Sequence, residues 1–419
     1  MRRLVELLKS ILIVLLLCSL TLLAVATVPT HTLREIPWLS SLLQPLAPLL
    51  GLPQAELAYV EAAPTILDAA QPVAISVRNS AGRSTALWDF PELDDRFDNL
   101  GSFLGQALDT AEIFTKVSQS QLQAALSAPG VYFSYSGPLP AALLASWLDA
   151  TLEAAVPETS GCLLALSGDT VNLYLIGETS YVAQTPLVAS ELEPLLEAYR
   201  PDGSQFAFEA AYSLAPLSLI PGETIVLPGG TVSNPVTSRF VEQLATDLGF
   251  NPYGESRYTD TDGAIHFSEA NCSLTIEANG RILLSSTAEE RFASSGPDLP
   301  SLVEAARRLT ALATGDSLGN GRLYLSAVTQ TEGETVCTFD YLFSGIPVQL
   351  DGGSAATVTF SGQTVTEMTV RPHSFYIGDR TIYPLPVAQA AALLTEGQPL
   401  ILQYRLTADG TLDAGWKKS

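Results

Sequence analysis

The alternation of apolar and polar residues along the chain predicts a mixed α+β protein. Segments that alternate with a period of two, as strands do, lie at 71–79, at 131–137 and, with a turn at Gly168-Asp169, at 162–177. Segments with helical spacing lie at 97–114, with Asp98 near the start, and at 139–155, with Pro140 in the first turn. We therefore expect antiparallel sheets flanked by helices, beginning with a first unit over residues 56–225.

The second half of the chain repeats one pattern, a helix followed by a meander of strands. The predicted helices and their strands are 238–250 followed by 257–286, and 298–314 followed by 321–350 and 355–370. Asp262-Gly263 and Asn279-Gly280 are strong hairpin signals within the first meander. The Pro- and Gly-rich segment 219–235 has the composition of a boundary, so we expect two further units, 226–290 and 291–419.

Three cysteines alternate with apolar residues in predicted strands. These are Cys162, Cys272 and Cys337. A buried free thiol packs as a small apolar side chain, so we expect core positions for all three. A disulfide between Cys272 and Cys337 is the alternative if the region lies outside the membrane. The apolar face expected around the last cysteine is formed by Cys337, Phe339, Tyr341 and Phe343.

An uninterrupted apolar run near the N-terminus predicts a single transmembrane helix. Residues 10–28, "SILIVLLLCSLTLLAVATV", carry no charge. In a helix this run is about 28 Å long, close to the roughly 30 Å hydrocarbon core of a bilayer. Arg2, Arg3 and Lys9 precede the run, which predicts a cytoplasmic stub at 1–9 and an extracellular remainder.

Two other interpretations of this apolar run stay open. Ala24-Val25-Ala26 resembles a signal-peptide cleavage site, although the run is longer than the apolar part of most signal peptides. Leu17-Cys18 is a weak match to a lipoprotein signal, because no small residue precedes the cysteine. Residues 29–55 are also apolar, but their prolines argue against a second span, so we expect a Pro-rich juxtamembrane segment there.

One face of the predicted anchor differs from the rest of the helix. Val14, Cys18, Thr21 and Val25 recur at spacings of four, three and four, and bulky leucines occupy the opposite face. Helices associate in lipid through small or weakly polar side chains that permit close approach. We therefore expect this face to bind a partner helix in the membrane.

Composition excludes several functional classes. The chain has 419 residues and a formal net charge of −23, which argues against binding nucleic acid or anionic lipid. The three histidines, His31, His266 and His373, are not spaced as metal ligands. We expect neither a metal nor another cofactor.

The string Gly315-Asp316-Ser317-Leu318 suggests a serine esterase, but its context favours a turn. A nucleophilic serine on an elbow follows a strand, whereas residues 301–314 have helical spacing. We therefore expect Gly315 to end this helix and Ser317 to lie in the turn that follows. His266, in mid-strand, and His373, without an acidic partner at the right spacing, do not complete a catalytic triad.

Two acidic motifs have structural explanations as well. Asp94-Asp95 has the form of paired catalytic carboxylates, and we expect it to be an exposed acidic loop. "YTDTDG" at 258–263 offers oxygen ligands like a calcium loop, yet it lacks the closing Glu. We expect a hairpin turn there.

Several segments of the second half resemble the YycH/YycI family. They are "RYTDTDGAIHFSEANCSLTIEANGRILL" at 257–284, "CTFDYLFSGIPVQLDGGSAATVTFSGQTVTEMTV" at 337–370, "YPLPVAQAAALL" at 383–394 and "LILQYRLTADGTLDAGW" at 400–416. The similarity covers roughly 235–419 together with the single anchor. The first unit matches only in layout, and its presence favours the longer YycH-like member.

The resemblance implies a regulator without catalytic activity. Family members are membrane-anchored accessory proteins of the WalK (YycG) sensor histidine kinase in Gram-positive bacteria, and they act together with a sister YycI-like regulator. A module that binds a cell-wall or small-molecule ligand is the second interpretation, and a deep pocket with convergent polar groups would favour it. An enzyme is the third, since folding can bring distant titratable groups together.

Overall fold

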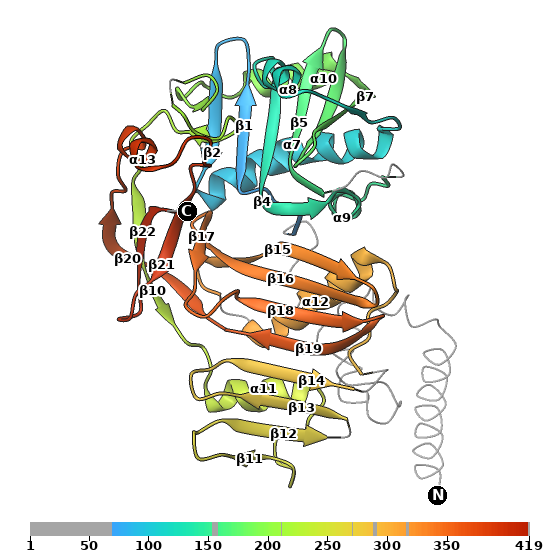
Figure 1. Ribbon diagram of the computed structural model, residues 1–419, viewed down its shortest axis with the longest axis vertical. Helices are drawn as coiled ribbons and strands as arrows, with labels where there is room; N and C mark the ends of the chain where they lie inside the picture. Colours follow the sequence, from blue (N-terminus) through green and yellow to red (C-terminus); the bar gives the residue numbers. More distant parts are fainter. Residues whose placement is uncertain are drawn as a thin grey trace, which may run out of the picture.

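The computed structural model describes residues 69–152, 158–210, 212–269, 271–287, 291–315 and 318–417. Within these residues the chain is a mixed α+β protein with antiparallel sheets and seven helices, as the hydrophobic pattern predicts. Figure 1 shows two units, one built on a seven-stranded sheet and one on a thirteen-stranded sheet. The predicted transmembrane span 10–28 lies outside the described residues, and none of the helices within them is both long and apolar enough to cross a bilayer.

The first unit is a seven-stranded antiparallel sheet with the strand order β2-β1-β4-β5-β6-β7-β3. Its strands are β1 (Ala74–Arg78), β2 (Arg83–Leu87), β3 (Thr115–Lys116), β4 (Gly130–Pro140), β5 (Glu158–Ser167), β6 (Thr170–Ile176) and β7 (Tyr181–Val188). Its helices are α7 (Phe90–Thr110), α8 (Gln119–Leu126), α9 (Ala141–Trp147) and α10 (Ala189–Glu197). The short pair β8 (Gln205–Phe206) and β9 (Leu219–Ile220) follows.

Helices lie on both faces of this sheet. The long helix α7 packs with α9 and α10 in the main core, around buried side chains such as Leu100 and Leu104. The opposite face has a smaller core, where Leu122 and Leu126 of α8 pack beside Phe206. This smaller core leaves part of the face over β6 and β7 open.

The second unit is one sheet, although its sequence repeats. Its strands are β10 (Leu227–Ser233), β11 (Tyr258–Thr259), β12 (Ile265–Glu269), β13 (Cys272–Ile276), β14 (Ile282–Ser286), β15 (Gly321–Thr331), β16 (Glu334–Phe343), β17 (Ile346–Gln349), β18 (Ala356–Ser361), β19 (Thr364–Val370), β20 (Ser374–Ile382), β21 (Leu402–Leu406) and β22 (Thr411–Trp416). Its helices are α11 (Ser238–Asp247), α12 (Leu299–Thr314) and α13 (Val387–Leu393).

The two helix-plus-meander patterns meet within this sheet. β14, the last strand of the first meander, pairs antiparallel with β19, the last strand of the second. The helices α11 and α12 cover the same face, where their apolar side chains share one core with those of the strands. Beyond this region β17 pairs with β21, the one parallel pair among the named strands of the described residues.

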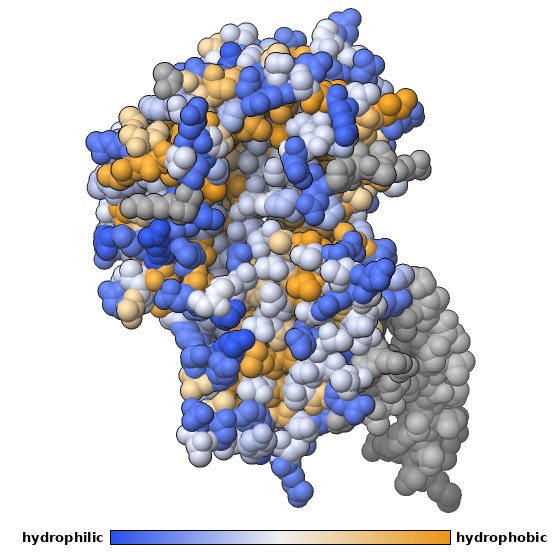
Figure 2. Space-filling view, viewed as in Figure 1, coloured by the Kyte–Doolittle hydropathy of each residue, from blue (hydrophilic) through white to orange (hydrophobic). Residues whose placement is uncertain are grey.

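The face that α11 and α12 leave uncovered is rich in hydroxyl side chains. These strands lie in front of the two helices in Figure 1, and the same region is mostly pale in Figure 2, which marks intermediate hydropathy. The hydroxyl side chains that are partly or fully exposed there include those of Ser273, Thr275, Thr357, Thr359 and Thr369. A sheet buried on one side only shows this alternation of apolar and polar residues.

The turn and cap signals of the second half are confirmed. Gly263 and Gly280, at the two predicted hairpin turns, have φ of +85° and +88°. Helix α12 begins after Asp298, whose side chain accepts a hydrogen bond from the backbone N–H of Ser301. It ends at Gly315, whose φ is +74°, which confirms the prediction that this glycine ends the helix.

The boundaries of two predicted helices are wrong. Helix α7 begins at Phe90 rather than 97, because Asp89 caps it and Arg96 occupies a buried position that breaks the apolar pattern. Asp94 and Asp95 therefore lie in a helix and not in an exposed loop. Helix α9 begins at Ala141, with Pro140 as its N-cap and not in its first turn, and it ends at Trp147 rather than 155, close to Asp149, whose φ is +55°.

The predicted cysteine positions are confirmed, whereas the alternative disulfide does not form. Cys162, Cys272 and Cys337 are buried free thiols. The predicted face of β16 is also buried, since Phe339 is 2% exposed and its neighbours on that face are fully buried. Burial raises the pKa of the Cys337 thiol to about 12, so it stays protonated at neutral pH.

Candidate functional site

The two units meet at an interlocked pair of turns. Trp88, which precedes Asp89, the N-cap of α7, has φ +61°, a conformation that a non-glycine residue rarely adopts. Gly345, between β16 and β17, lies against it, and a Cβ on this glycine would be 2.9 Å from the Trp88 Cα. The Trp88 ring packs edge-on against Trp416, with centroids 6.2 Å apart.

An ion pair joins the units beside these turns. The Arg322 guanidinium of β15 binds both carboxylate oxygens of Asp94 on α7, at 2.7 and 2.5 Å. It also donates to Gln71 at 2.7 Å and lies 4.0 Å from the centre of the Phe90 ring. The bidentate geometry fixes the orientation of α7 against β15.

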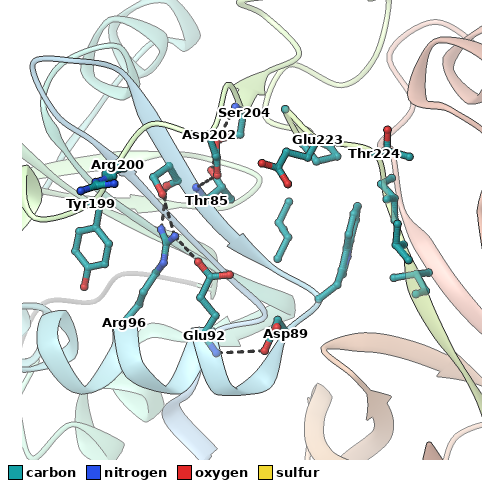
Figure 3. A pocket seen from close by; sticks show the side chains of 18 of the residues that line it. Thr85, Asp89, Glu92, Arg96, Tyr199, Arg200, Asp202, Ser204, Glu223 and Thr224 are labelled. Carbon is teal, nitrogen blue, oxygen red and sulfur yellow. Dashed lines mark hydrogen bonds and ion pairs between the residues drawn. The ribbon is translucent and has the colours of Figure 1, made fainter. Parts of the chain in front are cut away.

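A pocket of about 550 Å³ opens at this junction. Figure 3 shows its walls, which come from β2, the first turns of α7, the loop 198–204 and the connecting segment 221–227. The labelled polar side chains around it are those of Thr85, Asp89, Glu92, Arg96, Tyr199, Arg200, Asp202, Ser204, Glu223 and Thr224. Segments that are far apart in sequence therefore build one polar cavity.

Arg96 anchors the floor of the pocket. It is 6% exposed and donates to the Ser84 carbonyl and hydroxyl and to Glu92, the last at 2.5 Å. Its guanidinium also lies 4.9 Å from the centre of the Tyr199 ring. A buried cation needs such partners, so Arg96 is committed to holding α7 against β2.

Asp202 holds the opposite wall. Its carboxylate accepts hydrogen bonds from the backbone N–H groups of Thr85, at 2.7 Å, and of Ser204, at 2.8 Å. It thus occupies the outer edge of β2 and orders the loop. Asp89, Glu92, Asp202 and Glu223 outnumber the two arginines of the lining, so the pocket suits a polar ligand or partner with cationic groups rather than an anion.

A second hollow lies on the open part of the first sheet. It is a groove of about 850 Å³ over β6 and β7, bordered by α8 and by residues 110–117. Its floor includes Asn172, Tyr174 and Gln184. Only Glu112 among its lining residues is charged, which sets this groove apart from the junction pocket.

Two of the histidines considered in the sequence, His266 and His373, lie in different surroundings. His266 on β12 lies between Asp260, at 2.9 Å from Nε2, and the Thr275 hydroxyl, at 3.1 Å from Nδ1, with the Tyr258 ring stacked on it. The hydrogen bond from His266 is the main reason that the pKa of Asp260 is below its ordinary value. This acid–histidine–hydroxyl arrangement was not predicted, because its members come from one turn and two different strands.

His373 is positioned differently, next to the core of the second unit. Its Nδ1 is 2.9 Å from the Arg371 carbonyl, and burial lowers its pKa below the ordinary value of 6.5. The neighbouring Tyr341 hydroxyl accepts from the His373 backbone N–H. The ring is therefore neutral at pH 7 and committed to packing.

The remaining predicted positions fall outside the described residues. The anchor face Val14, Cys18, Thr21 and Val25 is among them, and so is Ser317. Within the described ranges, no group of three or more His, Cys, Asp or Glu side chains is arranged to hold a metal ion. Neither a family model nor any curated protein matches the chain.

Proposed function

We propose that the chain is a membrane-anchored extracytoplasmic regulator of a two-component sensor histidine kinase that controls cell-wall homeostasis. The observation that carries the proposal is the pair of helix-plus-meander patterns within the second unit, which contain α11 and α12. The segments that resemble the YycH/YycI family coincide with β11–β14, β16–β19 and the region from α13 to β22. The charge-free run 10–28 supplies the proposed anchor.

The structure of the junction supports a mechanical role for the proposed ectodomain. Trp88 and Gly345 interlock, and Arg322 pairs with Asp94 nearby. In this proposal the interlocked turns and the ion pair couple the two units, so that a partner acting on one unit biases the other. In this proposal the ectodomain biases a contact that the anchor makes with the kinase in the membrane.

The proposed membrane contact is the face formed by Val14, Cys18, Thr21 and Val25. Replacing both Cys18 and Thr21 by Leu should weaken association with a WalK-like kinase by about 1–2 kcal/mol, because bulky side chains prevent close helix packing. The measurement is co-purification of the two full-length proteins from membranes. A matched control replaces Leu16 and Leu20 on the opposite face by Ala and should retain the yield of the unaltered chain.

Two outcomes would count against this proposal. If the unaltered chain does not co-purify with the kinase or with a sister YycI-like regulator, the regulatory function is wrong. If it does, and the double variant does so equally well, the anchor face is wrong and the ectodomain makes the contact.

The second candidate is an anchored module that binds an extracytoplasmic ligand. The junction pocket favours it, because convergent polar groups on rigid elements are typical of ligand sites. The two functions are compatible, since a regulator can respond to a ligand that its ectodomain binds. A thermal shift of the purified full-length chain with a cationic peptide, and none with its acidic counterpart, would support ligand binding at the junction pocket.

A further inference from the structure

The groove over β6 and β7 presents a pair of free side-chain amides. Asn172 on β6 lies directly opposite Gln184 on β7 in the antiparallel register. Both side chains line the groove, and neither amide has a hydrogen-bond partner among the described residues. Each amide offers both donors and an acceptor, so the pair presents unused hydrogen-bonding groups of both kinds.

An aromatic ring lies beside the amides. Tyr174 is two residues beyond Asn172, so both side chains are on the same face of β6. The ring is partly buried against the smaller core of the first unit, which holds it in place. Apolar side chains extend the surface, among them Ile113, which is 74% exposed.

Charge separates this groove from the rest of the molecule. The chain carries a net charge of −23, yet the lining includes a single carboxylate, Glu112, and no Lys or Arg. The lining has no cationic side chain that could bind an anion, and one carboxylate is too little to select a cation. The ligand that fits is therefore uncharged.

We propose that this groove binds an uncharged glycan. Vicinal hydroxyls of a sugar both donate and accept, which matches the paired amides of Asn172 and Gln184. The apolar face of a pyranose ring can cover the Tyr174 ring, and the groove, at about 850 Å³, has the size of a ligand site that takes a short oligosaccharide. The inference is independent of the proposed kinase regulation and concerns a different part of the molecule.

A peptide strand fits this groove less well. Strand addition needs a free backbone edge on β7. β3 already pairs with β7 at Tyr181 and Val182, and Pro186, further along β7, has no N–H to donate. The remaining edge is too short for the ladder of hydrogen bonds that would hold a peptide.

The test is calorimetric titration of the purified full-length chain with two neutral sugars, the N-acetylglucosamine tetramer and cellotetraose. We expect at least one of them to bind with a Kd of about 10 µM to 1 mM. Asn172→Ala and Gln184→Ala should each weaken binding about 3- to 10-fold, the loss expected for uncharged hydrogen bonds. Tyr174→Leu should weaken it as well, because the planar ring face is lost.

A matched control is Gln330→Ala on β15, an exposed amide on the other sheet. It should bind like the unaltered chain, and circular dichroism should show that all variants are folded. Absence of binding to both sugars at about 10 mM would overturn the proposal. So would equal binding by all variants, or a neutral peptide that binds this groove in place of the sugars.

Discussion

Replacing Gly345 by Ala should weaken the junction between the two units. Gly345 has φ +75°, and an added Cβ would lie 2.9 Å from the Trp88 Cα and 3.3 Å from the Asp89 nitrogen. Both neighbours are backbone atoms, so they cannot rotate away as a flexible side chain would. Relief requires the turn before α7 and the turn between β16 and β17 to separate.

The expected cost has two parts. A left-handed backbone costs an L-residue about 1–2 kcal/mol, and overpacking a close contact costs about a further 1–3 kcal/mol. Gly333 separates the two parts, because its φ is +80° and nothing lies within 4 Å of an added Cβ. Gly333→Ala should therefore lower the free energy of unfolding by the backbone cost alone. Gly345→Ala should lower it by the backbone cost and the overpacking cost together.

Urea unfolding followed by tryptophan fluorescence would measure this difference. Trp88 and Trp416 lie at the interlocked turns, whereas Trp147 of α9 is buried in the core that both units share. We expect the Gly345 variant to unfold at lower urea than the Gly333 variant, with an earlier change in the junction signal. Equal losses in the two variants would refute the reasoning, because the junction would then open without cost.

Two further predictions concern stability. Phe339→Ala should lower the free energy of unfolding by about 3–5 kcal/mol, because the ring is 2% exposed under α12; an unchanged urea midpoint would contradict this core position. Asp298→Ala should destabilise α12, since hydrogen bonds from the Ser301 backbone and hydroxyl lower the pKa of Asp298 below 3.8. Because the pKa is lowered in the folded state, this stabilisation is present at neutral pH and is lost as the pH falls through the lowered pKa of Asp298. The stability difference between the variant and the unaltered chain should therefore shrink in acid. A difference that does not depend on pH would refute this prediction.

Local signals predicted much of the second unit. Gly263, Gly280 and Gly315 each occupy a position with positive φ, where a residue without a side chain avoids strain. Gly263 and Gly280 are the second residues of predicted hairpin turns, and Gly315 directly follows a predicted helix, so sequence alone located each turn or cap. Such signals depend on a few neighbouring residues, and tertiary packing does not override them here.

Arg96 explains why the start of α7 could not be predicted. A charged residue normally marks the exposed face of a helix, but this one is buried against Ser84 and Glu92. Its partner on β2 is twelve residues away and becomes a neighbour only after the chain folds. The apolar period therefore appeared to begin about two turns later, at Phe97.

The Pro- and Gly-rich segment 219–235 shows that composition alone does not separate a connection from a strand. Composition suggested a boundary, yet part of the segment is β10, a strand of the second sheet. Gly230 is there because a Cβ would lie 2.8 Å from Leu412 and 2.9 Å from Phe343. A glycine needed for close packing and a glycine needed for a flexible connection look the same in sequence.

The junction pocket was beyond sequence reasoning for a related physical reason. A tryptophan with φ +61° is strained by about 1–3 kcal/mol and persists only where its surroundings over-determine it. At Trp88 these surroundings are the capped start of α7, the turn at Gly345 and the ring of Trp416, which come from three separate parts of the chain. None of them selects this conformation alone. The junction is therefore a property of the assembled chain, and the pocket beside it is built from β2, α7, the loop 198–204 and the segment 221–227, which only folding brings together.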